Sequence, residues 1–374
     1  MVQLSLISLK ISHFRTHKLS FLEPANQPIV LFGLNGTGKT NVLEAVSMFA
    51  PGQGFRRAKF ADLNRRPELL GWKLTGEFKS PDSLFEIVTS WDESSGRKVL
   101  INGKLATQSE LGRLVRILWI TPVMDRIWLE GSLERRRFID RIVSNLIPNH
   151  TENIIQYYRA LKQRNRLIKN NITDWNWYDS VEKQMALFGV KIEEARLKVV
   201  DQITKKQKNS ISAFPVAKLY LVGSSYLCFD EFLLSLSENR KKDIHAGRTL
   251  LGPHLSDLGA IFEAKGIEAK NCSTGEQKAL LISIVIATAK IQIELFKTSP
   301  ILLLDEVSAH LDAARRTILY EELNNLNSQV FLTGTDCTIF EELKGRAKYY
   351  EVILSSSVSI CKPSDTLLVK NFEN

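Results

Sequence analysis

The chain has 374 residues, of which 44% are hydrophobic and 24% are charged, and it carries a formal net charge of +9 at pH 7. This length is enough for about two domains, and this composition excludes a wholly disordered protein. The positive charge favours an acidic partner, although the same excess spread over a large surface would also simply keep a protein soluble.

The cysteines and the N-terminus bear on the compartment. Four widely spaced cysteines form neither a zinc-ligand pattern nor a disulfide framework, which fits a reducing environment. The N-terminus lacks the basic start and long apolar run of an export signal, and no stretch of about 18 uninterrupted apolar residues occurs. We therefore expect a cytoplasmic protein without a membrane anchor.

The N-terminal region predicts strands, a glycine loop and a helix in succession. Apolar and polar residues largely alternate from Val2 to Phe21, as in one or two strands. The run Pro28–Phe32 is continuously apolar, which is typical of a buried strand, and it ends at a glycine. From Thr40 to Ala50 the apolar residues recur at helical spacing. This order is the one that a phosphate-binding loop requires.

The loop itself has the composition of a triphosphate site. Its glycines admit backbone geometries that let successive amides point at phosphate oxygens, and the following helix adds its positive end. We expect Lys39 to bridge the terminal phosphates of ATP and Thr40 to supply a hydroxyl to Mg²⁺. The nucleotide-binding residues are Gly33, Leu34, Asn35, Gly36, Thr37, Gly38, Lys39 and Thr40.

A small β lobe and then a helical block follow the loop. Short alternating segments from Trp72 to Ile101 predict antiparallel strands, and Asn102-Gly103 is a strong hairpin signal. After Pro122 the pattern changes to long amphipathic helices with little glycine, which indicates an inserted helical domain. These helices are expected over Ile127–Ile147, Glu152–Ile172 and Trp175–Ile211.

The first half of the helical block is strongly basic. Between Arg126 and Lys169 ten lysines and arginines face four acidic residues, so this stretch is a candidate surface for a polyanion. Within it, Arg135, Arg136 and Arg137 are our candidates for DNA contacts.

The C-terminal region returns to an α/β pattern near Thr249. It predicts a parallel-sheet core from alternating helices and buried strands. The expected elements are a helix over Thr274–Phe296, a strand over Ile301–Leu304, a helix over Ala314–Leu326 and a strand over Val330–Thr333.

Two carboxylates end the strand Ile301–Leu304. An acid at the end of a buried strand lies where the sheet edge meets a ligand, so we expect Asp305 to hold the metal, directly or through water. Glu306 is our candidate to orient or deprotonate the attacking water. Taken alone, such a pair is more often a plain strand end, but the phosphate loop upstream reverses that balance.

Upstream of that strand, Ser273, Thr274 and Gly275 open a long helix. A helix N-terminus with small residues favours an anion, although a serine followed three residues later by Glu276 is also an ordinary capping box. Its position, one helix and one strand before Asp305, matches the signature of ABC-type ATPases.

Taken together, the motifs narrow this resemblance to the RecF family of bacterial recombination mediators. The segments that resemble it run from the N-terminus to about Asp336; they are Phe14-Arg15, the loop from Gly36 through Ala45, Arg135–Asp140, Gly252-Pro253-His254 and Phe331–Asp336. The set is highly specific, although Gly252-Pro253-His254 alone would say little.

The resemblance implies a fold and a site. It implies an α/β fold: an ABC-type P-loop ATPase head with an inserted α-helical second lobe, divided as residues 1–125, 126–246 and 247–374. ATP with Mg²⁺ would lie between two subunits of a homodimer, with Ser273, Thr274 and Gly275 of one chain approaching the phosphates held by the other. Ser308–Asp312 would cross the dimer interface.

The resemblance also implies partners. It implies binding to double-stranded DNA and gapped DNA junctions, loading of a recombinase there, RecR and also RecO as partner proteins, and no membrane. The expected roles are replication-coupled repair and the response to DNA damage, with ATP hydrolysis releasing the dimer.

Three departures limit what carries over. Many relatives have arginine and aspartate where this chain has Leu255 and Ser256, and the segment Thr121–Asp125 lacks the glutamine of an ABC ATPase. Asp336 lies where transporter ATPases present a histidine, which weakens a transporter subunit as an alternative.

An SMC-type ATPase is another alternative, but it would need a long coiled coil, for which the insertion is too short. A third alternative is a module that uses ATP only to hold a dimer.

Overall fold

The computed structural model describes residues 2–81, 83–172, 174–210, 212–223, 228–308 and 311–364, in two compact units. The first unit consists of residues 1–125, 212–214 and 285–374, and the second of residues 126–211 and 215–284. The boundary after Asp125 coincides with the expected one. The second boundary lies within a helix at Ile284, and not at 246.

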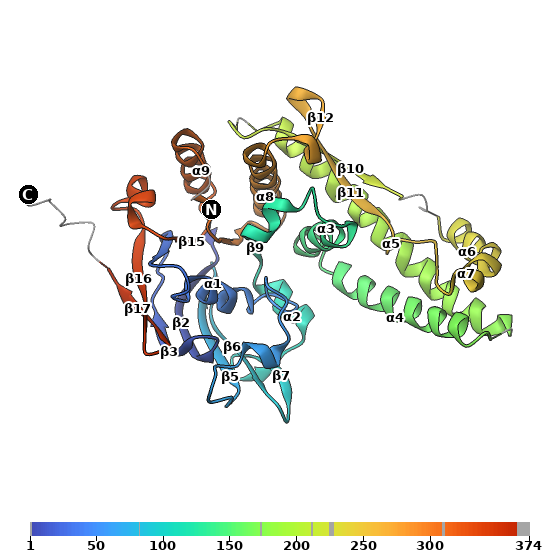
Figure 1. The fold of residues 1–374 in the computed structure, drawn as a ribbon, viewed down its shortest axis with the longest axis horizontal. Coiled ribbons are helices and arrows are strands. Elements are labelled where there is room, and N and C mark those ends of the chain that lie inside the picture. Colours follow the sequence, from blue (N-terminus) through green and yellow to red (C-terminus); the bar gives the residue numbers. More distant parts are fainter. Residues whose placement is uncertain are drawn as a thin grey trace, which may run out of the picture. The chain divides into compact units, whose positions relative to one another are not determined.

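A mostly parallel sheet forms the centre of the first unit (Figure 1). Its core strands are short, continuously apolar runs, because a parallel strand is buried on both faces. Only the pairing of β16 with β17 is antiparallel. In sheet order the strands are β17 (Val358–Pro363), β16 (Lys348–Ser355), β4 (Ile29–Phe32), β15 (Val330–Gly334), β14 (Ile301–Leu304) and β9 (Ile117–Ile120).

A second six-stranded sheet in this unit is antiparallel, as the alternating pattern predicts. At its hairpin Asn102 and Gly103 both have positive φ, 48° and 77°, which confirms the turn. The strands, in sheet order, are β3 (His17–Leu22), β2 (Ser5–Phe14), β5 (Trp72–Lys79), β6 (Leu84–Asp92), β7 (Gly96–Ile101) and β8 (Lys104–Leu105). A separate short pair joins β1 (Val2–Gln3) to β13 (Thr298–Ser299).

One apolar core joins the two sheets of the first unit. Phe49, Phe78 and Leu303, from three separate segments of the chain, belong to the same buried cluster. Helix α1 (Lys39–Ser47) is the next element after β4, and the glycine loop connects the two. Over the residues that the structure describes, this unit also contains the helices α1 (Lys39–Ser47), η1 (Phe60–Leu63), α2 (Gln108–Leu114), η2 (Pro122–Arg126), α9 (Ala313–Asn325) and η6 (Cys337–Leu343).

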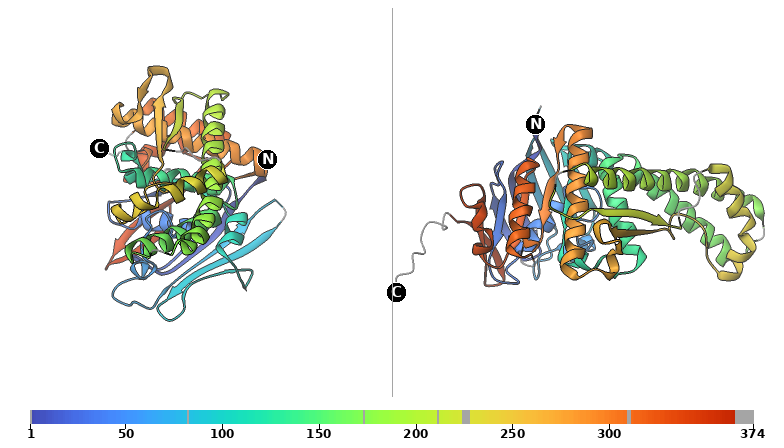
Figure 2. Two further views of the ribbon diagram at one scale, coloured as in Figure 1. Left: turned by 90° about the vertical axis from the view of Figure 1, so that its right-hand side faces the viewer. Right: turned by 90° about the horizontal axis from the view of Figure 1, so that it is seen from above.

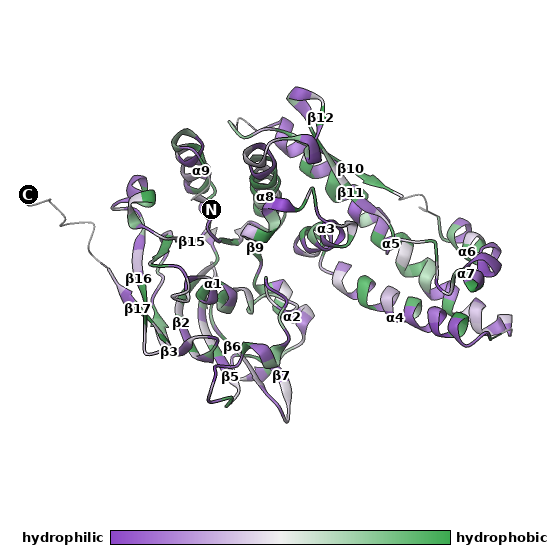
Figure 3. Ribbon diagram, viewed as in Figure 1, coloured by the Kyte–Doolittle hydropathy of each residue, from purple (hydrophilic) through white to green (hydrophobic). Residues whose placement is uncertain are grey.

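Helix α8 (Thr274–Phe296) carries the boundary between the units. Its hydrophobic colouring in Figure 3 reflects a composition that is long and apolar enough to cross a membrane. However, 72% of its most apolar window is buried within the structure. Burial in a protein core therefore explains the composition of this helix.

The second unit combines helices with a small antiparallel sheet. The strand of residues 217–222 pairs with that of residues 257–262, so the chain stays in this unit beyond residue 246. Our assignment of everything after 247 to the ATPase lobe is therefore wrong for these strands. The elements are α3 (Ser132–Leu146), α4 (His150–Lys169), α5 (Trp175–Lys208), β10 (Ala217–Val222), α6 (Phe229–Glu238), α7 (Arg240–Ala246), β11 (Asp257–Phe262), η3 (Glu263–Lys265), β12 (Ile267–Glu268) and η4 (Ala269–Asn271).

A fully buried ion-pair network holds the helices of the second unit together. The Arg164 side chain, on α4, donates to Oε1 of Glu182 at 2.9 Å and to Oδ2 of Asp243 at 2.5 Å. It also donates to the hydroxyl of Thr249 at 2.9 Å. All four residues are at most 2% exposed. Because α4 and α5 run side by side, as Figure 2 shows, one guanidinium can satisfy carboxylates from α5 and α7 at once.

We predict that Arg164→Ala destabilises the second unit by about 3–5 kcal/mol, because it leaves the buried Asp243 without its cation. Glu182 loses one of its two cations and keeps Arg240. The measurement is thermal unfolding of the full chain. Arg159→Ala removes an exposed arginine from the same helix and serves as the control. Equal melting temperatures for the two variants would contradict the assigned role of the network.

Candidate nucleotide-binding site

The phosphate loop is held open by three glycines in conformations that other residues rarely adopt. Gly33, Gly36 and Gly38 have φ of +145°, +81° and +105°. A Cβ at Gly33 would lie 2.3 Å from the backbone oxygen of Val352, and one at Gly38 would lie 2.4 Å from the hydroxyl of Ser359. The glycines thus serve both the backbone turn and the close approach of the β16–β17 hairpin.

Lys39, the first residue of α1, places its ammonium group inside the loop. Its Nζ donates to the backbone oxygens of Gly33 at 2.7 Å and Leu34 at 2.8 Å. Burial lowers the pKa of Lys39, and the negative charges of Glu306 and Asp305 oppose that shift. The cation therefore lies where it can balance both the carboxylates and a phosphate.

Asp305 lies at the carboxyl end of β14 and accepts two hydroxyl hydrogen bonds on one oxygen. Its Oδ1 accepts from Oγ1 of Thr40 at 3.0 Å and from Oγ1 of Thr333 at 2.8 Å. Burial raises the pKa of Asp305, while these two hydrogen bonds lower it. The loop hydroxyl and the strand-end carboxylate, which are far apart in sequence, thus meet.

The residues at this point suit Mg²⁺. Thr40 and Asp305 offer hard oxygen ligands in direct contact with each other. Over the residues that the structure describes, no group of three or more His, Cys, Asp or Glu side chains gathers as a metal site. The protein would therefore supply one or two ligands and leave the others to phosphate and water, which is how Mg²⁺ is usually bound.

Glu306 occupies an unusual backbone conformation. Its φ is +52°, in the left-handed region that glutamate rarely adopts, and its N–H donates to Oγ1 of Thr333 at 2.8 Å. Such strained residues cluster at functional sites. Thr333 thus fixes both Asp305 and Glu306, a role that the sequence pattern of its strand did not reveal.

A buried carboxylate on α1 is a second feature that we did not assign from the sequence. Glu44 is 0% exposed and accepts a bidentate pair of hydrogen bonds from Arg15, at 2.9 and 2.8 Å. Arg56 donates to Asn41 at 3.0 Å and lies 3.4 Å from Glu44. The positive charge of Arg56 also lowers the pKa of Asp305. A charged residue on the apolar face of a helix was the available signal.

The loop is also supported from behind by two buried side chains. Nδ1 of His17 lies 2.8 Å from the hydroxyl of Ser20, and Nε2 lies 3.2 Å from the backbone oxygen of Gly38. Ser359, on β17, donates from its hydroxyl to the backbone oxygen of Thr37 at 2.6 Å. The loop is therefore fixed by residues from β3 and from the C-terminal hairpin.

The segment Thr121–Asp125 follows β9 and reaches the same sheet edge. The N–H of Asp305 donates to the backbone oxygen of Ile120 at 2.9 Å, so the segment begins beside Asp305. Asp336, by contrast, is the N-cap of η6. Its Oδ1 accepts a hydrogen bond from the N–H of Thr338 at 2.9 Å.

The signature residues lie in the second unit, at the start of α8. Ser273 and Glu276 form the capping box: the N–H of Ser273 donates to Glu276 at 2.9 Å, and that of Glu276 donates to Ser273 at 3.4 Å. A contact with Lys265 and these bonds lower the pKa of Glu276 to about 2. Ser273 and Thr274 are exposed, and Gly275 is half-buried. In the segment Ser308–Asp312, residues 309–310 lie outside the described residues.

The three candidate DNA-binding arginines do not form one exposed group. Arg135 makes a bidentate ion pair with Asp257 at 2.8 and 2.7 Å, and Arg136 donates to the backbone oxygen of Ser256 at 2.8 Å. Both are half-buried, whereas Arg137 is exposed and contacts Glu134. Only Arg137 of the three has its side chain at the surface.

The turn Gly252-Pro253-His254 packs inside the second unit. Nδ1 of His254 lies 2.8 Å from the hydroxyl of Tyr157, and burial lowers the pKa of His254 to about 4. Ser256 is buried, and its hydroxyl accepts from Arg196 at 2.6 Å. This histidine is therefore packed into the interior of the second unit.

Comparison with known proteins identifies relatives over almost the whole chain. Residues 5–355 match the family model of the RecF/RecN/SMC N-terminal domain. The protein "DNA replication and repair protein RecF" of Rhizobium rhizogenes is 40% identical over 358 residues, covering 92% of this chain and 96% of that protein. The protein of the same name from Rhizobium meliloti is 39% identical over 361 residues, covering 93% and 96%.

Solved structures share the fold. One described as the recombination mediator protein RecF with ATP, in the RecFOR pathway, has a TM-score of 0.82 at 21% identity and covers 97% of this chain and 100% of its own. An SMC head bound to the C-terminal winged-helix domain of ScpA has a TM-score of 0.58 at 17% identity, covering 97% and 98%. These likenesses confirm the expected α/β ATPase-head fold.

We predict that acid destabilises the first unit through His17. Burial lowers the pKa of His17 from 6.5 to about 4, so the unfolded chain binds this proton more readily. Stability is therefore lost as pH falls from 6.5 towards 4, by about 2 kcal/mol at pH 5. In thermal unfolding between pH 7.5 and 5, His17→Gln should reduce the loss, whereas His245→Gln, at an exposed site, should not. An unchanged pH dependence in His17→Gln would contradict this prediction.

Proposed function

The chain belongs to the RecF family, and from that premise we propose that it is an ATP-dependent protein of DNA replication and recombinational repair. Its ATPase head would bind ATP, form a dimer and bind DNA. Hydrolysis of the ATP would dissociate the dimer. The observation that carries this proposal is the meeting of Thr40, Asp305 and Glu306 with the phosphate loop at one sheet edge.

Each residue of the site has a role in hydrolysis. The loop amides and Lys39 would bind the β- and γ-phosphates, and Thr40 and Asp305 would hold Mg²⁺, which neutralises phosphate charge when bound. A water oxygen attacks the γ-phosphorus, the bond to the bridging oxygen breaks, and ADP leaves with that electron pair. The carboxylate of Glu306 would orient this water and accept its proton.

The second half of the site would come from another copy. Ser273 and Thr274 are exposed at the start of a long helix, where amides and the positive helix end favour an anion. With Gly275 they would contact the γ-phosphate bound to the partner's loop, and Ser308–Asp312 would cross the interface. Loss of that phosphate removes the contact that favours the dimer, so hydrolysis would dissociate it.

DNA would be the macromolecular partner. The charge of +9 and the basic stretch from Arg126 to Lys169 favour sequence-independent contacts with phosphates. We propose binding to duplex DNA near single-strand gaps in the cytoplasm, with RecR and RecO as partner proteins in loading the recombinase. Relatives named as DNA replication and repair proteins support this role.

Replacement of Glu306 by glutamine should slow ATP hydrolysis by about a hundredfold to ten-thousandfold, because it removes the proton acceptor. This variant should retain ATP and accumulate dimers in size-exclusion chromatography, whereas Lys39→Ala should bind ATP poorly and stay monomeric. Glu351→Gln, at an exposed carboxylate of β16, is the control. Hydrolysis by Glu306→Gln at the wild-type rate would refute the catalytic role.

Arg137→Ala should weaken binding to blunt duplex DNA and reduce the salt dependence by about one unit of the log–log slope, since it removes one exposed phosphate contact. The triple alanine variant of residues 135–137 should weaken binding further, although Arg135→Ala also leaves Asp257 without its cation. Fluorescence anisotropy over a salt series measures the affinity and its salt dependence for each variant. Lys344→Ala, at an exposed position, is the control. An unchanged slope in the triple variant would refute these contacts.

A further inference from the structure

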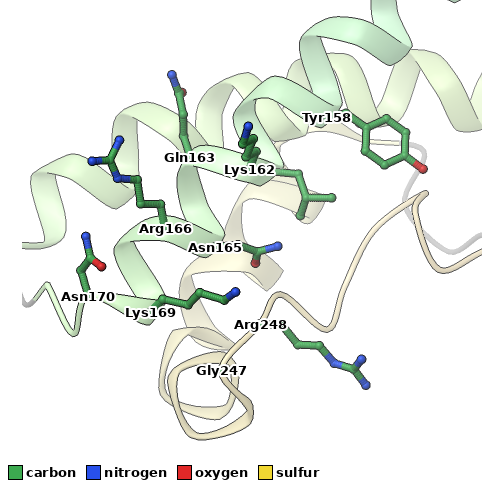
Figure 4. Close-up of a pocket in the computed structure, with 10 residues that line it drawn as sticks. Tyr158, Lys162, Gln163, Asn165, Arg166, Lys169, Asn170, Gly247 and Arg248 are labelled. Carbon is green, nitrogen blue, oxygen red and sulfur yellow. The ribbon is translucent and has the colours of Figure 1, made fainter. Parts of the chain in front are cut away.

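The second unit contains a pocket that the nucleotide site does not use. It has a volume of about 760 Å³ and lies between the C-terminal half of α4 and the loop Gly247–Arg248 (Figure 4). The residues that carry the argument are Tyr158, Leu161, Lys162, Asn165, Lys169 and Arg248.

The charged side chains at this pocket are all cationic. Lys162, Arg166, Lys169 and Arg248 line it, and no acidic residue does. All four are exposed, and no ion pair joins any of them to another residue in the described part of the chain. Figure 4 shows Lys169 extending towards the loop that bears Arg248, whereas Arg166 points away from that loop. Their positive charges are therefore available to an anionic ligand.

The side-chain amide of Asn165, which also lines the pocket, is placed to act as a donor. Oδ1 of Asn165 accepts from the N–H of Thr249 at 2.9 Å and from its hydroxyl at 2.8 Å. The amide oxygen is thereby occupied, which leaves the NH₂ group of Asn165 to face a ligand. Lysine, arginine and this amide group thus present N–H donors, which suit the oxygens of an anion.

An aromatic ring and an aliphatic floor complete the pocket. The ring of Tyr158 is 41% exposed and is held edge-on by the buried ring of Tyr157, with centroids 5.8 Å apart and an interplanar angle of 81°. Leu161 is only 6% exposed. An oriented, accessible aromatic ring next to phosphate-binding cations is the combination that binds single-stranded nucleic acid by stacking.

We propose that this pocket binds a short stretch of single-stranded DNA, with phosphate oxygens at Lys162, Lys169 and Arg248 and one base against Tyr158. The inference rests on the proposed DNA-binding function and deepens it. A duplex keeps its bases stacked inside and cannot offer one to Tyr158. An acidic peptide would satisfy the cations but has no general use for the ring. The pocket would hold the unpaired strand of a gap while other surfaces hold the duplex.

The test uses the full chain with ATP and two fluorescent probes, an oligothymidylate of about 12 nucleotides and a blunt duplex of the same length. The double variant Lys162→Ala/Lys169→Ala should bind the single strand about tenfold more weakly, with a salt slope reduced by about 1.4. Tyr158→Leu should weaken it about fivefold to hundredfold without changing that slope. Duplex affinity should change less than about twofold, because the rest of the basic surface is intact.

The double variant Lys183→Ala/Lys198→Ala removes the same charge from exposed positions on α5 and is the matched control. The proposal fails if the two double variants bind the single strand with equal affinity, or if Tyr158→Leu binds it normally. It also fails if the affinity for duplex DNA falls as much as the affinity for the single strand. It also fails if polyglutamate displaces the probe as well as unlabelled oligothymidylate does, since the occupant would then be an acidic protein segment. Normal ATP-dependent dimerisation and duplex binding in these variants would leave the proposed function standing.

Discussion

The nucleotide site depends on the parallel pairing of β4, β15, β14 and β9. Parallel strands end at the same edge, so the phosphate loop after β4, the carboxylates after β14 and the segment after β9 must meet there. The register of β14 with β15 then brings the hydroxyl of Thr333 to Asp305. Two side-chain contacts and one backbone contact thereby join Asp305 to Thr40, Thr333 and Ile120.

Both units pair their buried charged side chains with partners of opposite charge. Glu44 in the first unit and Arg164 in the second are 0% exposed, and each is satisfied by bidentate or multiple charge-assisted hydrogen bonds. Such networks add little net stability over apolar packing, yet they penalise any arrangement that separates the partners. They therefore fix α1 beside β2 and α4 beside α7. The exposed cations of α4, by contrast, form no ion pair with any described residue.

Local patterns predicted the elements of the site well, because each motif determines its own backbone. Three glycines define the phosphate loop, an apolar run defines β14, and Ser273 with Glu276 begins α8 at the expected residue. The features that escaped prediction depend on contacts distant in sequence. Thr333 looks like any strand residue until β14 pairs with β15. Arg135 looks like an exposed cation until Asp257, 122 positions away, takes both of its donors.

The same reason explains the misplaced domain boundary, since only strand pairing shows that β11 remains with β10. A long-range contact also has a consequence for biosynthesis. The hydroxyl of Ser359 on β17 braces the backbone of Thr37, a separation of 322 positions. During translation the phosphate loop is synthesised early, whereas Ser359, which supports it, is synthesised close to the end. The nascent chain therefore lacks a fully supported phosphate loop for most of its synthesis, and the loop reaches its final packing only when the last strand has joined the sheet.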